Sequence, residues 1–289
     1  MMTVQEKNTL KERMRRCQLD MLRELKRVCD ANGIRFWLDA GSMLGAVRHG
    51  GFIPWDDDID VIMFRRDYDR LVSVAASEFH APYRFQTAYS EFNFVRGHAQ
   101  LRDTRTSAII PEEIYKRFNQ GLFIDVFPLD NVYDDEKRMK RTLRRAYGLR
   151  RRLEYAAMPL RNYGHDFFRV LKSLLYKCIY PTKRAFNRAY AKYENYFRSI
   201  PEGKLVAACA YTRENRRLDR GLFGGTVMLK FEGLDMPVPA RYDELLREYY
   251  GDDYMTPRQA ANDHGNLIID IDTPSEQKCA ELRKERHRK

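Results

Sequence analysis

The chain of 289 residues has no apolar run approaching the roughly 20 residues that cross a bilayer. Its first 16 residues lack the apolar core of a secretory signal, so we expect no leader. Cysteine is scarce, and the five present are widely spaced with no Cys-x-x-Cys pair: Cys17, Cys29, Cys178, Cys209 and Cys279. This odd number argues against a disulfide framework or a zinc site and indicates a reducing compartment. We therefore expect a cytoplasmic protein, either soluble or peripheral at the inner face of the membrane.

Acidic residues are nearly absent from one long block. From Lys137 to Lys192 there are 17 Lys or Arg against only Glu154 and Asp166, a balance of +15. Because the whole chain carries +11, the remainder carries −4. The hydrophobic content of 44% is ordinary, and the length suits one large domain or a domain with an insertion.

An acidic run precedes an apolar strand in the segment Asp56-Asp57-Asp58-Ile59-Asp60-Val61-Ile62-Met63. Side chains alternate along a strand, so Asp58 and Asp60 share one face, about 7 Å apart. Two such carboxylates repel unless a cation lies between them. Magnesium, or manganese, is the natural candidate, because hard divalent cations prefer oxygen ligands. A plain acidic turn is the alternative.

Gly41-Ser42 follows an apolar stretch at 34–40 and opens a short helix at 43–48. A glycine–serine turn at a helix N-terminus offers free N–H groups and a hydroxyl, which suit a phosphate. Arg48 and His49 come just after this helix and are further candidates for substrate binding.

Asp125 is a lone charge in the apolar segment 121–128. A buried unpaired carboxylate is costly, so Asp125 should line the same site or pair with an arginine. In the predicted strand 94–102, Arg96, His98 and Arg102 share a face, and Arg105 follows. Arginine forks suit phosphate oxygens, and Arg102 is a candidate for gripping a pyrophosphate; solvated strand charge is the alternative.

Three segments together resemble the LicD family, which includes fukutin-related proteins, within the nucleotidyltransferase superfold. The longest and most specific runs from Leu38 to Asp60; the others are 123–130 and the weaker 242–257. The resemblance implies transfer of a phospho-substituent, such as phosphocholine or ribitol phosphate, from a CDP-activated donor to a glycan hydroxyl. The acceptor belongs to a cell-surface glycan, with or without a lipid link.

The same resemblance implies roles for particular residues. Gly41 and Ser42 would meet donor phosphate, and Asp58 and Asp60 would hold magnesium. Asp125 would be the third catalytic carboxylate, either as a metal ligand or as the partner of the acceptor hydroxyl. Between residues 130 and 200 no family motif is found.

Periodicity predicts an α/β fold with a nucleotidyltransferase-like mixed sheet flanked by helices. Helices are expected at 4–31 and 66–79, and strands at 34–40, 58–64, 83–88, 94–102 and 121–127. Residues 137–198 should be wholly helical. We divide the chain into a catalytic core (1–135), a basic helical insertion (136–200), a part completing the catalytic domain (201–275) and a charged tail (276–289).

One segment of the basic block, from Phe167 to Tyr180, is unusually apolar and is closed by Pro181. A helix with a cationic face and an aromatic–aliphatic face can lie in a membrane interface, so 137–192 could contact a membrane. A core helix with its lysines in water is the alternative.

Two other functions remain open. The same carboxylates would serve nucleotidyl transfer from an NTP. A pI of about 9.4 and a basic block interleaved with tyrosines suit a non-catalytic nucleic-acid binder. Nucleic acid is the weaker alternative, because the acidic run repels a phosphate backbone. Trp37 and Trp55 could stack on a base but sit beside apolar residues, and His264 is a lone loop histidine.

Overall fold

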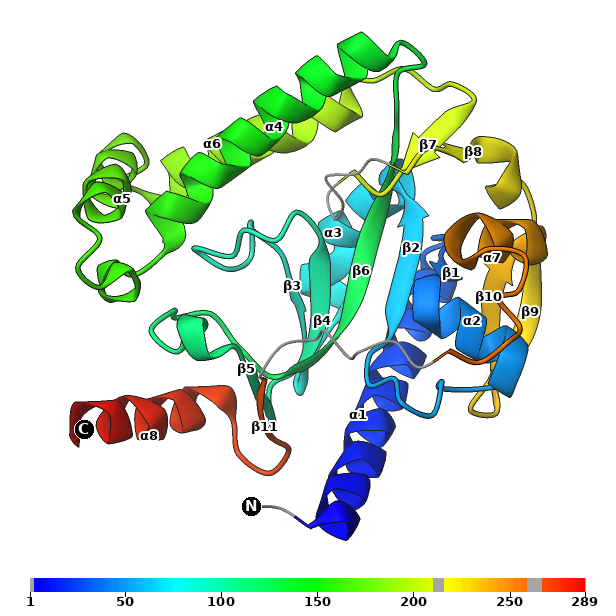
Figure 1. The fold of residues 1–289 in the computed structure, drawn as a ribbon, viewed down its shortest axis with the longest axis horizontal. Coiled ribbons are helices and arrows are strands. Elements are labelled where there is room, and N and C mark those ends of the chain that lie inside the picture. The colour runs from blue at the N-terminus through cyan, green and yellow to red at the C-terminus, as the bar shows by residue number, and fades with distance from the viewer. Residues whose placement is uncertain (1–2, 210–215, 259–266, 289) are drawn as a thin grey trace.

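The computed structural model describes residues 3–209, 216–258 and 267–288. Figure 1 shows a central sheet with α1 and α3 behind it and a helical arm extending to one side. The α-helices are α1 Val4–Ala31, α2 Ala40–His49, α3 Arg65–Glu78, α4 Glu136–Ala157, α5 Phe167–Ile179, α6 Lys183–Arg198, α7 Tyr242–Tyr250 and α8 Ser275–Arg288. The strands are β1 Trp37–Leu38, β2 Asp60–Phe64, β3 Tyr83–Gln86, β4 Ala99–Asp103, β5 Ser107–Ile109, β6 Leu122–Asn131, β7 Leu205–Ala207, β8 Leu218–Asp219, β9 Thr226–Phe231, β10 Leu234–Pro239 and β11 Ile268–Asp270.

The main sheet of the described residues is mixed and has the order β1-β2-β6-β4-β3, with β7 pairing β6 and β8 pairing β7. Strands β2 and β6 are parallel, and their register places Asp60 beside Asp125. Strands β4 and β6 are antiparallel, and Gln100 lies beside Asp125 on the other side. Because paired residues point to the same face of a sheet, these three side chains share one face. The expected α/β class with a mixed sheet and flanking helices is confirmed.

The opposite face of the sheet is apolar and is covered by helices. The helix predicted at 4–31 is α1, and it packs on β4 and β6 through Met21, Leu25 and Val28. The helix predicted at 66–79 is α3, which packs on β2, β3 and β6. These two long amphipathic helices fix the sheet from behind and leave the carboxylate-bearing face for the site.

The boundaries near the site differ from the sequence prediction. Only residues 37–38 of the strand expected at 34–40 are paired, because Asp39 caps α2 and the helix begins at Ala40. Gly41 and Ser42 therefore lie in the first turn of a helix and not in a loop. The strand expected at 94–102 begins only at Ala99, since Gly97 has a positive φ of 85° that interrupts an extended strand.

The segment 137–198, expected to be wholly helical, contains α4, α5, α6 and a short 3-10 helix at Leu160–Tyr163, with short non-helical connections between them. Its core is a second apolar cluster in which aromatic side chains of α6 pack on α4: Phe186, Tyr190, Tyr193 and Phe197 against Met139, Leu143 and Leu153. Figure 1 shows α4 and α6 side by side, with α5 at the end of this arm farthest from α7 and β9.

The residues after the arm return to the core. Strand β7 pairs with β6, the β9–β10 hairpin packs on β1 and α2, and α7 packs on α2. At the other edge β11 pairs with β5, and α8 packs there through Cys279. Across the described residues, no helix combines the length and apolar character needed to cross a membrane.

Candidate active site

Asp60 and Asp125 lie side by side at the start of β2 and in the middle of β6. They are paired residues on adjacent parallel strands, which run about 4.8 Å apart. The backbone N–H of Asp125 donates to the carbonyl of Ile59 at 3.0 Å, which locks this register. Two carboxylates from segments 65 positions apart in the sequence thus share one small region of the sheet face.

The first turn of α2 is joined directly to Asp60. The N–H of Asp39 donates to the Asp60 carbonyl at 3.0 Å, and the N–H of Asp60 donates to Ser42 Oγ at 2.9 Å. Ser42 is buried, so its hydroxyl positions the strand that carries Asp60. Ala40, between these contacts, has φ 43°, a left-handed conformation that is costly for a residue with a Cβ.

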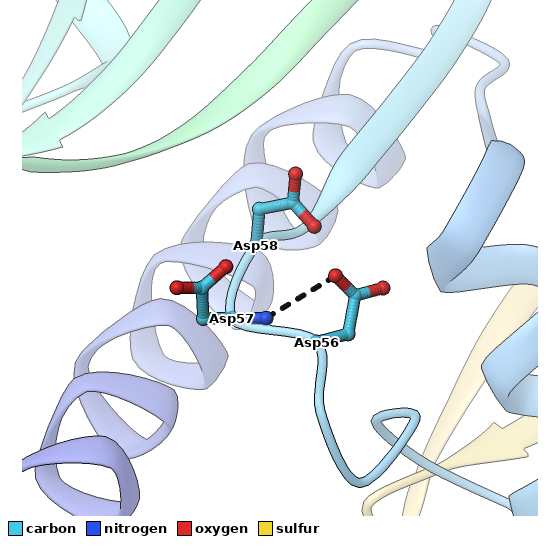
Figure 2. Close-up of side chains that lie close together, drawn as sticks. All are labelled: Asp56, Asp57 and Asp58. Carbon is cyan, nitrogen blue, oxygen red and sulfur yellow. Dashed lines mark hydrogen bonds between the residues drawn. The ribbon is translucent and has the colours of Figure 1, made fainter. Parts of the chain in front are cut away.

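The acidic residues before β2 form a bend held from behind by α1. Arg15 donates to the carbonyls of Ile53 and Asp56 at 2.6 and 2.7 Å, and Gln18 donates to the carbonyl of Asp57 at 2.8 Å. Figure 2 shows the resulting bend, in which the N–H of Asp57 donates to Asp56 Oδ1 at 3.2 Å. Within the described part of the chain, Asp56, Asp57 and Asp58 form the group whose carboxylate oxygens lie within 4.8 Å of one another.

Two glycines allow this loop to lie against α2. A Cβ on Gly45 would lie 2.3 Å from the carbonyl oxygen of Gly51, so no other residue fits without moving the backbone. A Cβ on Gly41 would lie 2.6 Å from Asp56 Oδ2. Gly41 therefore contributes a close approach between the helix start and a carboxylate, in addition to its backbone N–H.

Burial and mutual repulsion disfavour the ionised forms of Asp58 and Asp60. Burial, followed by the neighbouring charge of Asp56, raises the pKa of Asp58 to about 8. Burial and the charges of Asp58 and Asp125 hold the pKa of Asp60 well above its ordinary value. A group of hard oxygen donors that repel one another fits a divalent cation, since binding one would keep these carboxylates ionised.

Asp125 differs from the other two because it has hydrogen-bond partners. Its Oδ1 lies 3.0 Å from His98 Nε2 and accepts from Gln100 Nε2 at 2.8 Å. Burial opposes ionisation of Asp125, but the His98 and Gln100 contacts outweigh it, and its pKa is lowered. An arginine partner for Asp125, the alternative read from the sequence, is replaced by this histidine–glutamine pair.

The prediction that Arg102 grips substrate requires correction. Arg102 is 2% exposed and donates from its three nitrogens to Gln86, to the carbonyl of Gly121 and to Gln100. Burial lowers its pKa to about 9. Arg102 uses its donors within the protein; it holds Gln100, which in turn donates to Asp125. The sequence pattern placed Arg102 on the right face but could not show that its donors are used internally.

The remaining predicted residues have partners or positions outside the group of carboxylates. Arg48 donates to the carbonyl of Tyr254 at 3.0 Å and lies over Trp55, next to Asp56, whereas His49 is exposed at the far end of α2. Arg105 pairs with Asp103. Trp37 is fully buried and belongs to the core. His264 is outside the described residues.

Sequence reasoning missed three residues beside the carboxylates. Asp39 accepts from the Tyr249 hydroxyl at 3.0 Å, and burial raises the pKa of Asp39 to about 6. Burial and the charges of Asp39 and Asp60 raise the pKa of Tyr250. Both tyrosines come from α7, within the weak 242–257 resemblance, which was the available signal. The exposed Arg216 lies over the Tyr249 ring at 5.2 Å and lowers the pKa of Asp39, so it brings a cation to this side.

A cavity of about 400 Å³ opens between the sheet face and the helical arm. His98 lines its wall, so the cavity is separated from Asp125 by one side chain. Arg96 and Lys116 also line the cavity, and each forms an ion pair with Glu113 in which a side-chain nitrogen lies 2.7 Å from a carboxylate oxygen. Its apolar lining comes from the loops before β4 and β6 and from the end of α4: Phe94, Phe118, Ala157 and Met158. A mixed aromatic and charged lining at this volume is typical of a small-ligand site.

Comparison with known proteins matches residues 33–158 to the family described as "LicD/FKTN/FKRP, nucleotidyltransferase domain". Residues 33–158 are therefore similar to a LicD-family domain. The matched segment contains Asp58, Asp60 and Asp125 and all residues that line the cavity, and it ends at the end of α4. The resemblance read from the sequence is thereby confirmed.

Two relatives extend the comparison. The chain is 29% identical over 250 residues to "Lipopolysaccharide cholinephosphotransferase LicD" of Haemophilus influenzae, a match that covers 86% of this chain and 92% of the relative. It is 42% identical over 66 residues to "Ribitol 5-phosphate transferase FKRP" of Homo sapiens, covering 22% of this chain and 13% of that relative. The first match includes the helical arm and the C-terminal part, and the second covers a short segment.

Proposed function

We propose that the chain is a metal-dependent phosphotransferase that moves a phospho-substituent, such as phosphocholine, from a CDP-activated donor to a hydroxyl of a cell-surface glycan. The observation that carries this proposal is the pairing of Asp60 with Asp125 beside the first turn of α2, directly after the acidic group Asp56–Asp58. The match to a lipopolysaccharide cholinephosphotransferase over 92% of its length supports it. A nucleotidyltransferase-type fold is part of the same proposal.

Asp58, Asp60 and Asp125 would hold Mg²⁺ or Mn²⁺, and Asp56 is close enough to Asp58 to contribute. The ion would supply Lewis-acid stabilisation of charge on phosphate oxygens. The chain itself contributes the helix start at Gly41 and Ser42, whose N–H groups face anionic ligands favourably. Arg216, whose charge acts on Asp39, and Arg48, which lies over Trp55, are two cations at this end of the site that could meet the donor phosphates.

In the proposed step the acceptor hydroxyl oxygen attacks the donor phosphorus that bears the substituent. A new P–O bond forms, the bridging P–O bond of the pyrophosphate breaks, and its electron pair leaves with CMP. Asp125 is ionised because its pKa is lowered, so it can orient the hydroxyl and accept its proton. His98 and Gln100 keep the Asp125 carboxylate in one orientation.

The cavity lined by His98 is the proposed acceptor site. It lies on the same sheet face as Asp125, and its Arg96–Glu113–Lys116 cluster presents fixed donors and acceptors next to aromatic rings. A sugar is bound by both kinds of group, because its hydroxyls form hydrogen bonds and the faces of its ring pack on aromatic side chains. A donor held at α2 and an acceptor held in this cavity would meet at Asp60 and Asp125.

The product nucleotide tests the proposal against its closest rival. Incubation with Mg²⁺ and CDP-choline, CDP-ribitol or CDP-glycerol, together with a glycan acceptor, should release CMP. Incubation with NTPs should release no pyrophosphate. Pyrophosphate release without CMP release would replace the proposal by nucleotidyl transfer. Salt-sensitive binding of RNA or DNA that is unaffected by EDTA, with neither product, would favour a nucleic-acid binder.

A further inference from the structure

Helix α5 turns its apolar side to solvent. Six of its large hydrophobic side chains are between 43% and 73% exposed: Phe167, Phe168, Leu171, Leu174, Leu175 and Ile179. At about 100° per residue these positions lie on one side of the helix. Isolated exposed apolar residues are ordinary, but six on one side of a 13-residue helix form a continuous patch.

The side of α5 that faces the protein carries two hydrogen-bonding side chains beside the partly buried Tyr176 ring, which packs on the apolar cluster of the arm. Ser173 is fully buried and donates its hydroxyl to the carbonyl of Tyr155 at 2.9 Å. Lys177 donates from Nζ to the carbonyls of Ala156 and Met158 at the end of α4. The helix is therefore fixed to α4 by hydrogen bonds on this side, and its outward apolar orientation is a determined feature of the fold. The alternative read from the sequence, a core helix with its lysines in water, does not describe α5.

The surroundings of this patch are strongly cationic. Exposed cations flank the helix on its own turns and on the neighbouring segments: Arg161, Arg169, Lys172, Lys183 and Arg184. The block from Lys137 to Lys192 carries a balance of +15. Figure 1 places α5 at the outer end of the arm, away from the sheet.

We propose that the outward face of α5 docks on an anionic lipid bilayer, with the six apolar side chains entering the interface and the flanking cations contacting headgroups. Charge complementarity favours this occupant over a second copy of the chain, because two copies would bring two cationic blocks together. Lysine and arginine at the patch edge can extend to headgroups while their stems stay in the apolar layer. This inference does not depend on the phosphotransferase activity.

Cys178 provides a probe for the test, because it is exposed on α5 and Cys29, Cys209 and Cys279 are buried. A polarity-sensitive fluorophore is attached to Cys178 in the full chain, in a Cys17→Ser background. Vesicles of phosphatidylglycerol and phosphatidylcholine should shift its emission to the blue, and vesicles of phosphatidylcholine alone should do so much less. A blue shift that grows with protein concentration in the absence of lipid would show self-association and overturn the proposal.

Matched variants identify the surface by vesicle sedimentation. Phe168→Ser/Leu171→Ser/Leu175→Ser should weaken partition into anionic vesicles at least tenfold, and Lys172→Glu/Arg184→Glu should weaken it severalfold and reduce its salt dependence. The control Val227→Ser/Met228→Ser/Met255→Ser changes three exposed apolar residues elsewhere and should bind as the parent does. Because all these positions are exposed, melting temperatures should stay close to that of the parent. Equal loss in the control, or undiminished binding of the α5 triple variant, would reject the proposal.

Discussion

Arg65 is joined to Asp130 by two parallel hydrogen bonds, with Nε 2.6 Å from Oδ1 and the second terminal nitrogen 3.1 Å from Oδ2. Arg65 also contacts Glu194 of α6 at 3.3 Å, and Glu194 pairs with Arg198. Arg198 in turn forms a two-pronged pair with Asp69 of α3. This network, which is buried at Arg65, Asp130 and Glu194, joins β6 and α3 to the helical arm.

Replacing Arg65 by methionine should lower the free energy of unfolding by about 3–5 kcal/mol, because Asp130 and Glu194 would remain buried without their shared partner. Burial already raises the pKa of Asp130 against the effect of Arg65. Urea unfolding followed by circular dichroism measures the loss. Arg66→Met is the matched control, since Arg66 is the next residue on α3 and is exposed. Similar losses in both variants would show that the network contributes little.

Asp60→Asn and Asp125→Asn should slow phospho-transfer by about 10²–10⁴-fold, because each removes a charge that the proposed ion and acceptor require. CMP release at saturating Mg²⁺ is the measurement. The exposed Asp134→Asn is the control and should retain the parent rate. Parental rates in either site variant would remove these carboxylates from the mechanism.

Stability of the EDTA-treated protein should fall as the pH rises from about 5 to about 8. The folded-state pKa values of Asp39 and Asp58, about 6 and about 8, lie above their ordinary 3.8. The folded protein therefore binds these protons more tightly than the unfolded chain, and their stabilising contribution is present at low pH and lost as the pH rises through those values. Melting temperatures should drop by a few degrees over this range, and less in Asp58→Asn. Mg²⁺ added at pH 8 should restore the melting temperature, and a flat profile in EDTA would contradict the burial of these charges.

Met158→Trp should fill part of the cavity next to His98 and raise the KM for the acceptor at least tenfold, with little change in the KM for the CDP donor. Met158 lines the cavity at the end of α4, and a larger side chain there removes space without removing a charged group. Met255→Trp, at an exposed position, controls for the substitution itself. A change in the KM for the donor alone would show that the acceptor site is not this cavity.

Much of the scaffold was predictable from periodicity, but the assembly of the site was only partly so. The helix at 4–31 was predicted to its ends, because its apolar spacing is long and regular and Asn32-Gly33 stops it. The adjacency of Asp60 and Asp125 depends on a parallel pairing across 65 positions, which no local pattern specifies. The motif resemblance supplied that expectation instead.

Other features depend on tertiary contacts that a sequence pattern cannot reveal. Arg102 lies on the same sheet face as the site, but its N–H groups donate to other protein groups. The contact of Asp39 with Tyr249 joins residues 210 positions apart in the sequence. The periodicity of 167–179 shows that the helix is amphipathic but not which side is turned outward. That choice is made by the hydrogen bonds of Ser173 and Lys177 to α4.

The Arg65 network also has a geometric consequence. Because the buried pairs of Arg65 with Asp130 and Glu194 hold α6 against β6, the strand that carries Asp125, they restrict movement of the arm relative to the carboxylates. If α5 rests on a bilayer, the reacting atoms stand at a set height above the lipid. The length of the arm would then determine which glycan hydroxyls can react: those that project to that height, and not those nearer to or farther from the surface.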